Sequence, residues 1–361
     1  MTTESNQPWP RIASLATAVP PHRVPQNEAM GFFQRSFDAP PARRGRLKQL
    51  FLNADIENRY AAAPIPWYER DHSFELKNNL YIDKALDLLK QVTIDSLTAA
   101  GLACSDVDTL VTVSSTGVAV PTLDVRLMEE LPFRRNVQRL PVFGLGCAGG
   151  ALGLARAAAC ARAQPGSCIL CLVVELCTLT FCRSDQMTAN IVATALFGDG
   201  AAGAVLTTDG PGPAIRAWGE HTWPHSLDVM GWHVTQNGLE VRLSRGVPDV
   251  ARYQVRRVTD EFLASVGLEL ADVDDFICHP GGTRVLEALE DAFGLPSGGL
   301  AASREILRDY GNMSAATVLF ILKRALVTSA ADDRRRAGAR RYLMTGLGPG
   351  FSIGYLVLES A

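Results

Sequence analysis

The sequence predicts an α/β protein built from two similar halves, and three observations support this fold class. Short apolar segments rich in Val, Leu and Ile, typical of buried strands, alternate with longer segments that carry apolar residues at helical spacing. This order runs through the first 210 residues and recurs in the rest of the chain. With 361 residues, 47% of them hydrophobic, the chain also exceeds the size of about 250 to 300 residues at which single cores stop growing.

The first half contains two helix candidates and four expected strands. Residues 81–102 carry apolar side chains at helical spacing, and residues 148–163 are almost purely Ala, Leu, Gly and Arg. The segments expected to be buried strands are residues 109–114, 140–143, 168–175 and 203–207. The linker is expected at residues 208–218, because Gly and Pro alternate within it. We therefore assign residues 1–210 and 211–361 to the two halves.

The second half repeats this alternation. Its expected helices are residues 250–266, 284–293 and 315–328. Its expected strands are residues 275–278, 342–345 and 351–358. Alternating strands and helices indicate layers of helices packed on sheets.

Composition and charge exclude several classes of protein. The net charge of −3 provides no overall positive field to attract nucleic acid or an anionic membrane. The most apolar run, residues 168–182, includes Glu175 and is shorter than the roughly 20 residues of a membrane span. The first eleven residues lack the charged and apolar regions of a signal peptide. Most of the eight cysteines lie in or beside apolar segments, which indicates reduced thiols and a cytoplasmic protein.

Cys147 is the candidate nucleophile. It lies between glycines in the segment FGLGCAGG, residues 143–150, where an expected strand ends and a helix begins. Free N–H groups and the positive end of the helix dipole favour the thiolate there, and glycine lets an acyl carbonyl approach closely. Two alternatives are a buried structural cysteine and a dinucleotide fingerprint. The fingerprint also needs an acidic residue about 20 positions later, and no Asp or Glu lies between residues 147 and 174.

Two further residues are candidate partners of this thiol. His279 follows the strand-like segment at residues 275–278 and precedes a Pro-Gly-Gly turn, so it lies at a strand end. Asn312 precedes the apolar helix expected at residues 315–328, where its ordinary role is a helix cap or turn residue. Three polar residues at element boundaries in one chain favour a catalytic set over three separate structural roles.

Five longer motifs occur in the order found in type III polyketide synthases. They are GLGCAGG, ALFGDGAAGAV, CHPGGTRVL, YGNMSAATVLFIL and TGLGPGFSIG. The sequence resembles this chalcone synthase-like family across nearly its whole length. The resemblance implies a thiolase fold, in which two similar halves, each a mixed sheet between helices, form a five-layer αβαβα arrangement. It also implies a homodimer.

The resemblance assigns a role to each catalytic candidate. Cys147 is similar to the nucleophile that accepts the starter acyl group from CoA, and His279 to the residue that pairs with its thiolate. Asn312, together with His279, would donate hydrogen bonds to the enolate formed when malonyl-CoA loses CO₂. The enolate then attacks the acyl group on Cys147, and the extended chain cyclises. This chemistry implies no metal and no redox cofactor.

Two other classes of protein remain as alternatives. The β-ketoacyl carrier-protein synthases that start fatty acid synthesis share the Cys, His and Asn set, although the motifs at residues 310–322 and 345–350 are more similar to the polyketide synthases. A noncatalytic acyl-CoA-binding scaffold that has kept the fold is the other alternative. An ordinary thiol reactivity at Cys147 would favour the scaffold.

The residues expected around the substrate also follow from the resemblance. Phe197 matches the family's aromatic gatekeeper, whereas Val241 stands where a second gatekeeping Phe is expected, so the pocket should be wider. Leu347 replaces the usual Phe of the GFGPG loop, a departure from plant-like flavonoid chemistry. Core packing is the alternative role for Phe197.

The expected starter unit depends on further positions: Ser115 and Cys177 match cavity-lining positions of the family, and Thr180 is expected nearby. The motifs ELCTLTF and VATALFGDG resemble bacterial alkylpyrone and alkylresorcinol synthases, which take long fatty acyl-CoA starters. An apolar tunnel lined by small residues suits such a chain. The alternative within the family uses malonyl-CoA itself as starter and makes tetrahydroxynaphthalene.

The expected substrates are therefore malonyl-CoA and an acyl-CoA. The CoA phosphates need positive charge at the entrance. Arg46 matches one CoA-contacting position within a basic cluster at residues 43–48, for which a solvated helix face is the alternative, and Arg284 lies near the expected tunnel mouth.

Overall fold

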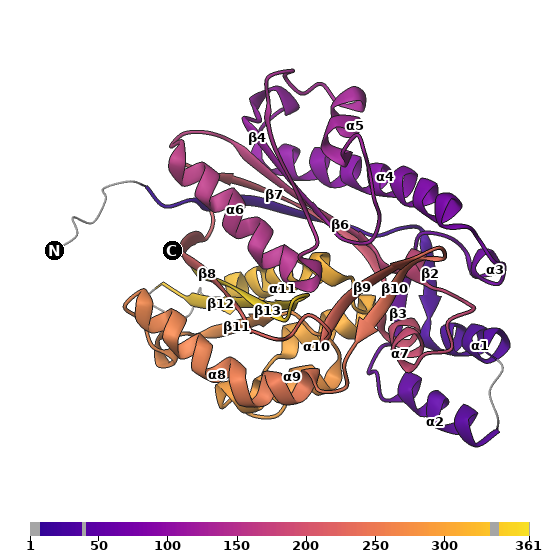
Figure 1. The fold of residues 1–361 in the computed structure, drawn as a ribbon. Coiled ribbons are helices and arrows are strands. Elements are labelled where there is room, and N and C mark those ends of the chain that lie inside the picture. Colours follow the sequence, from indigo (N-terminus) through magenta and orange to yellow (C-terminus); the bar gives the residue numbers. More distant parts are fainter. Residues whose placement is uncertain (1–7, 38–40, 333–338, 361) are drawn as a thin grey trace.

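The computed structural model describes residues 8–37, 41–332 and 339–360. In this part of the chain, nine strands form one sheet in the order β11-β12-β13-β8-β1-β7-β6-β4-β5. Figure 1 shows two groups of strands with helices α6 and α11 between them, α4 beyond one group, and α8 and α9 beyond the other. The molecule is therefore layered, as the alternating sequence pattern predicts.

The two groups of strands correspond to the two halves of the chain. The first contains β1 (Arg11–Ala18), β4 (Thr109–Ser114), β5 (Gln138–Phe143), β6 (Ile169–Leu176) and β7 (Asp199–Thr207). The second contains β8 (Ala214–Thr222), β11 (Asp275–Cys278), β12 (Arg341–Gly348) and β13 (Ser352–Glu359). The described strands β1 and β8 pair through Arg11 and Ala214 alone, so a single short contact joins the groups.

Side chains on opposite faces of the strands contact different layers of helices. In β6, Leu170 and Leu172 pack in a core with α4 (Phe74–Ala100), whereas Ile169 and Cys171 pack in the central core with α6 (Gly149–Ala163) and α11 (Thr317–Asp332). This alternation follows from the two-residue period of a strand, and both faces are apolar because both are covered.

The second group of strands is covered in the same way. In β13, Leu356 and Leu358 face the central core, whereas Tyr355 and Val357 face α8 (Val247–Ser265) and α9 (Thr283–Phe293). Helix, sheet, helix, sheet and helix follow one another, so the predicted five-layer αβαβα arrangement is confirmed.

The longest helix, α4, has clear start and stop signals. The Ser73 side chain accepts a hydrogen bond from the Leu76 N–H at the first turn, and Gly101 ends the helix in the left-handed conformation with φ of 69°. The helix begins seven residues before the predicted start at residue 81, and none of the residues in this added stretch is fully buried.

The predicted linker at residues 208–218 is wrong in its second part. Ala214–Thr222 forms β8, which pairs antiparallel with β13 along its length. The connection between the halves is therefore limited to residues 208–213, which contain the Gly and Pro residues. After Pro213 the chain regains a strand-forming apolar pattern, with Ala214 and Ile215 buried.

Several short elements that the sequence pattern did not predict gather beside the main sheet. The helices are α1 (Gln26–Ser36), α2 (Pro41–Leu52), α3 (Ile65–Tyr68), α5 (Leu123–Glu130), α7 (Thr188–Leu196) and α10 (Ala301–Tyr310). Two antiparallel sheets of two strands each accompany them, β2 (His22–Pro25) with β3 (Asn58–Ala61) and the hairpin of β9 (Met230–Thr235) and β10 (Gly238–Leu243). Of the helices that the structure describes, none combines the length and apolar character needed to cross a membrane.

Candidate active site

Cys147 lies in the turn between β5 and α6, as its sequence context predicts. The turn is the short 3₁₀ helix Gly146–Ala148, and part of Cys147 remains exposed. Gly146 has φ of 48°, a conformation that side chains other than glycine rarely adopt, and its N–H donates to Ser115 Oγ over 3.0 Å. Gly346 of β12 passes so close that a Cβ there would lie 2.9 Å from the Cys147 carbonyl oxygen. Both glycines are needed for the backbone to hold Cys147 in this position.

Asn312 contacts the thiol through its side-chain amide. Its Oδ1 accepts a hydrogen bond of 2.8 Å from the Ser314 N–H, which leaves the NH₂ group to bond with the Cys147 sulfur and lower the pKa of that thiol. The Asn312 backbone is held by the Leu196 carbonyl at 2.8 Å and by the Gly198 N–H at 3.0 Å. The structure therefore brings Cys147 and Asn312 together from opposite halves of the chain.

His279 directly follows β11 and is buried, with 3% of its surface exposed. Its backbone N–H donates to the Thr345 carbonyl over 2.9 Å, one residue before the glycine that contacts Cys147. Neither ring nitrogen has a hydrogen-bond partner among the described residues, Cys147 included. Burial lowers the pKa of His279 to about 3, so the imidazole is neutral and has an N–H free to donate.

Burial opposes the thiolate that the start of the helix is expected to favour at Cys147. Desolvation raises the pKa of Cys147 to about 12, and the negative charge of Glu175 adds to the increase, whereas the hydrogen bonds with Ser314 and Asn312 lower it. Burial therefore acts against a thiolate at this position, whereas the donors at the start of α6 act in its favour.

Two residues that the sequence analysis did not assign, Ser314 and Glu175, complete the surroundings of the thiol. Cys147 Sγ donates to Ser314 Oγ over 3.7 Å, and Ser314 Oγ donates to Glu175 Oε1 over 3.3 Å. Glu175 is fully buried in β6, and desolvation raises its pKa to about 7. An acidic residue inside an otherwise apolar strand was the available signal, because a buried charge is costly and needs dedicated partners.

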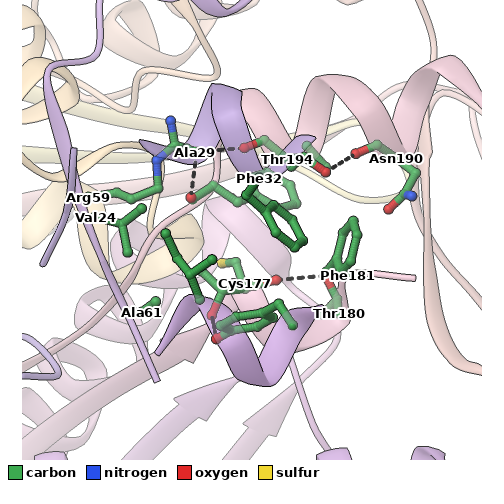
Figure 2. A pocket seen from close by; sticks show the side chains of 15 residues that line it. Val24, Ala29, Phe32, Arg59, Ala61, Cys177, Thr180, Phe181, Asn190 and Thr194 are labelled. Atoms are coloured by element: carbon green, nitrogen blue, oxygen red, sulfur yellow. Dashed lines mark hydrogen bonds between the residues drawn. The ribbon is translucent and has the colours of Figure 1, made fainter. Parts of the chain in front are cut away.

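A cavity next to this site is lined almost entirely by apolar groups (Figure 2). It encloses about 580 Å³, part of it open to solvent. Three of the predicted substrate residues, Phe197, Cys177 and Thr180, line this cavity. The other walls come from α1, α3, α7 and the strands β2 and β3, and they include Val24, Ala29, Phe32, Ile65 and Tyr68. These elements thus form a pocket that the sequence pattern could not outline.

Phe197 is contacted by Trp232, an aromatic residue that the sequence analysis did not assign. The two rings meet edge to face with centroids 6.3 Å apart. Val241 pairs with Trp232 across the β9–β10 hairpin, so both side chains lie on the face of the hairpin that meets Phe197. The small side chain at Val241 is therefore accompanied by a large ring on the neighbouring strand.

Arg59 is a buried cation in the wall of the same pocket. Its guanidinium donates to the carbonyl oxygens of Thr194 at 2.6 Å, Ala195 at 2.8 Å and Phe197 at 3.2 Å. These carbonyls belong to the end of α7, where a cation also interacts favourably with the helix dipole. Desolvation lowers the pKa of Arg59 to about 10, while Asp199 opposes this decrease. Arg59 thus holds the segment that carries the predicted gatekeeper.

The remaining predicted substrate residues are more scattered. Ser115 is buried beside Cys147, where its N–H donates to Glu175 Oε2 over 2.9 Å. Leu347 packs in the core of the second half and does not line the apolar pocket. Arg284 is exposed in the first turn of α9. The backbone of Arg46 lies in α2, but its side chain lies outside the described residues.

No group of three or more His, Cys, Asp and Glu side chains within the described ranges is arranged to hold a metal ion. The five-layer fold defines the class of protein, a thiolase-fold enzyme, in which Cys147 and Asn312 meet as candidate catalytic residues.

Comparisons with known proteins identify the family within this class. Residues 3–211 match the N-terminal domain of chalcone and stilbene synthases, and residues 217–361 match the C-terminal domain. The chain is 38% identical to 1,3,6,8-tetrahydroxynaphthalene synthase of Streptomyces peucetius subsp. caesius, over 96% of this chain and 92% of that protein. It is 36% identical to a putative chalcone synthase of Bacillus subtilis (strain 168), over 94% of this chain and 96% of that protein.

Solved structures agree with the sequence comparisons. The crystal structure of PKS-I from the brown alga Ectocarpus siliculosus superposes with a TM-score of 0.91 and 26% identity, over 99% of this chain and all of that one. The crystal structure of 1,3,6,8-tetrahydroxynaphthalene synthase from Streptomyces coelicolor A3(2), a bacterial type III polyketide synthase, superposes with a TM-score of 0.90 and 27% identity. The match covers 96% of this chain and 98% of that one. The chain belongs to the chalcone and stilbene synthase family and is a type III polyketide synthase, an acyltransferase.

Proposed function

We propose that this enzyme extends an acyl group, held as a thioester on Cys147, by repeated decarboxylative condensation with malonyl-CoA. The observation that carries the proposal is the meeting of a cysteine thiol with the amide of Asn312 beside an apolar pocket. A thiol is a suitable acyl acceptor, and neutral hydrogen-bond donors stabilise an enolate without protonating it.

His279 and Asn312 have complementary parts in this mechanism. The imidazole of His279 is neutral at physiological pH and has no protein partner in the described chain, so its N–H is available to a thioester oxygen. The Asn312 amide is oriented by the bond between its Oδ1 and the Ser314 N–H. When malonyl-CoA loses CO₂, both groups would donate to the enolate oxygen, and the enolate carbon would attack the thioester on Cys147.

We further propose that the starter is a long fatty acyl group and that the products are alkylpyrones or alkylresorcinols. The support is the apolar lining of the pocket, which adjoins the nucleophile through Cys177 and extends towards α1. Each methylene buried in such a pocket contributes about 0.8 kcal/mol to binding. The exposed Arg284 and the basic helix α2 with Arg46 would meet the phosphates of CoA, and the enzyme would act as a homodimer.

A second candidate product is tetrahydroxynaphthalene, formed with malonyl-CoA as both starter and extender. The observation that favours it is the 38% identity to the Streptomyces peucetius enzyme of that name. In this alternative the pocket would hold the growing polyketide instead of an alkyl tail.

The test is to incubate the purified protein with malonyl-CoA and acyl-CoAs from acetyl to long-chain, and to identify products by mass spectrometry. Pyrones or resorcinols formed with long starters would support the fatty acyl proposal, whereas a product from malonyl-CoA alone would support the second candidate. Absence of condensation with every CoA ester would overturn both and favour a carrier-protein-dependent enzyme or a binding scaffold.

Two variants test the roles of the residues. Cys147→Ala should abolish acyl loading and product formation. Asn312→Ala should still be acylated on Cys147, measured by intact mass, but should lose malonyl-CoA decarboxylation. Unchanged decarboxylation would leave Asn312 with a structural role alone.

A further inference from the structure

The turn of the β9–β10 hairpin is attached to the first half of the chain by the side chain of Lys77. Its ammonium group donates a hydrogen bond of 3.3 Å to the Asn237 carbonyl, in the turn, and one of 2.8 Å to the Phe181 carbonyl, at the end of the 3₁₀ helix Cys177–Thr180. Lys77 lies in the first turn of α4, which the hairpin reaches from the second half of the chain (Figure 1). One side chain thus joins three segments that are far apart in the sequence.

Both segments that Lys77 joins to α4 carry residues of the proposed substrate site. Phe181 lines the apolar pocket. The hairpin carries Trp232, whose ring contacts Phe197, and it also carries Val241 on the paired strand. The two bonds of Lys77 therefore restrain the distance between the pocket wall and the hairpin that carries these side chains.

A second, smaller cavity lies where these segments meet. It encloses about 240 Å³, part of it open to solvent, and most of its lining comes from the start of α4, the hairpin and the 3₁₀ helix. Lys77 and Leu239 belong to this lining, and Thr180 lines both this cavity and the apolar pocket. Side chains therefore fill the space beside the hairpin only in part. Because a hairpin of two strands is marginally stable by itself, its position depends on such links to the rest of the protein.

The surroundings of Lys77 distinguish it from an ordinary surface lysine. The side chain is half-buried, and desolvation lowers its pKa, whereas Cys182, Asp71 and Glu240 oppose this decrease. A partly buried ammonium group needs acceptors, and hydrogen bonds from a charged donor are among the stronger ones in proteins. Because both acceptors of Lys77 are backbone carbonyls, these bonds restrain the path of the chain itself.

We propose that Lys77 is a positioning residue that anchors the β9–β10 hairpin against the wall of the substrate pocket, and that this anchor limits the length of the polyketide. The proposal rests on the proposed function and deepens it, because it concerns the same site. Without the two bonds of Lys77, the hairpin turn moves away from the 3₁₀ helix and the second cavity widens beside Thr180. The growing chain then gains room for a further extension before it cyclises.

A role of Lys77 in stability alone predicts a different outcome. Loss of a merely structural residue lowers the amount of folded enzyme, so all products decrease by the same factor. A change in the distance between the hairpin and the pocket wall instead alters the competition between cyclisation and a further condensation within each folded molecule. The ratio of products separates the two roles, because it does not depend on the amount of folded enzyme.

The first measurement is amide hydrogen exchange of residues 230–243, followed by mass spectrometry on the full-length protein. Lys77→Met keeps an apolar side chain of similar length but removes the donors, so exchange in this segment should become about 10- to 100-fold faster. Lys77→Arg keeps a charged group with several N–H donors and should stay near the wild-type rates. Lys84→Met is the control on the same helix, because Lys84 bonds with Asp87 and its loss should leave the hairpin unchanged.

The second measurement is the ratio of longer to shorter polyketides formed from malonyl-CoA and one fixed acyl-CoA starter. Lys77→Met should raise this ratio about 3- to 10-fold, the range that one net hydrogen bond contributes, whereas Lys77→Arg should keep the wild-type ratio.

A second pair of variants keeps the proposal testable if Lys77→Met does not fold. The ring of Phe74 lies 3.2 Å from the position that a Cβ on Gly238 would take, so it contacts the hairpin turn from the same end of α4. Phe74→Ala should therefore change the exchange rates and the product ratio in the same direction as Lys77→Met. Phe74→Leu keeps an apolar contact and should change neither.

Two results would overturn the proposal: wild-type exchange rates of residues 230–243 in Lys77→Met, or faster exchange with an unchanged ratio of products. The second result would leave Lys77 as a structural link alone, with the proposed function intact. A wild-type enzyme that condenses no CoA ester would instead sink the proposed function together with the control of its products. The exchange rates would still decide, without any condensation, whether Lys77 anchors the hairpin.

Discussion

Filling the apolar pocket should abolish the proposed use of long acyl starters and leave the use of short ones, and Ala29 is a suitable position for this test. Ala29 is buried in α1 and lines the pocket next to Phe32, whereas Cys147 and Asn312 lie on other elements. Ala29→Phe therefore places a ring in the space proposed for the alkyl tail without touching the residues of the reaction.

The magnitude follows from the apolar contact that the tail loses. Each buried methylene contributes about 0.8 kcal/mol, which corresponds to roughly fourfold in kcat/KM. A ring at Ala29 that displaces four methylenes should then cost about 3 kcal/mol, or roughly 200-fold in kcat/KM for a long starter. Acetyl-CoA, which does not reach this wall, should be used as before.

The assay is kcat/KM for acyl-CoAs of increasing length, with malonyl-CoA saturating and products quantified by mass spectrometry. Ala29→Ser is the matched control, because it keeps the space open at the same position and should keep the steep dependence on chain length. A folded Ala29→Phe enzyme with the wild-type dependence on chain length would refute the assignment of the pocket to the alkyl tail.

Three further predictions test other parts of the structure. Trp232→Ala removes the ring packed on Phe197 and should shift the products towards longer polyketides, whereas Trp232→Phe should not. An unchanged product ratio in Trp232→Ala, measured by mass spectrometry, would contradict a role of Trp232 in limiting product length. The pKa of His279 is about 6.5 in the unfolded state and about 3 in the folded state. The free energy of unfolding should therefore decrease as the pH falls from 6.5 towards 3, by at most about 1.4 kcal/mol per pH unit. Urea unfolding at pH 6.5 and 4.5 measures this loss, which should be smaller in His279→Gln than in the wild type. An equal loss in both proteins would contradict a buried neutral imidazole at His279. Arg59→Met leaves the α7 carbonyls and Asp199 without their cation and should cost about 3 to 5 kcal/mol in the free energy of unfolding, so a loss below about 1 kcal/mol would contradict its role.

The layered fold was predictable because its signals are local. A strand covered on both faces must be apolar along its length, as in β6, and an apolar helix after a glycine turn is recognisable as in α6. The linker was placed wrongly in part because Ala214–Thr222 belongs to a strand whose partner, β13, is more than 130 residues away in the chain. Pairing over such a distance leaves little trace in the strand itself.

The candidate site was predictable residue by residue but not as a set of contacts. Glycine-rich turns around Cys147, His279 and Asn312 mark each of them in the sequence, because tight turns at element boundaries need glycine. Of the two expected partners of the thiol, Asn312 contacts it, whereas the contact with Ser314 was not expected. In the structure Cys147 bonds with Ser314 and Asn312, while His279 has no hydrogen-bond partner in the described chain.

The amino-acid sequence by itself indicated the α/β class, most strands of the main sheet and the apolar helices, since these depend on short-range pattern and composition. The expectation of a buried strand at residues 140–143 was wrong, because this segment belongs to the edge strand β5, most of whose residues are exposed. The tertiary structure alone decided the surroundings that shift the pKa of Cys147, the hydrogen bond from Ser314 to Glu175 and the residues that line the pocket. The physical reason is that desolvation and hydrogen bonding depend on which atoms surround a group in space. Those atoms come from β4, β6, α7 and the segment before α11, which only folding brings together.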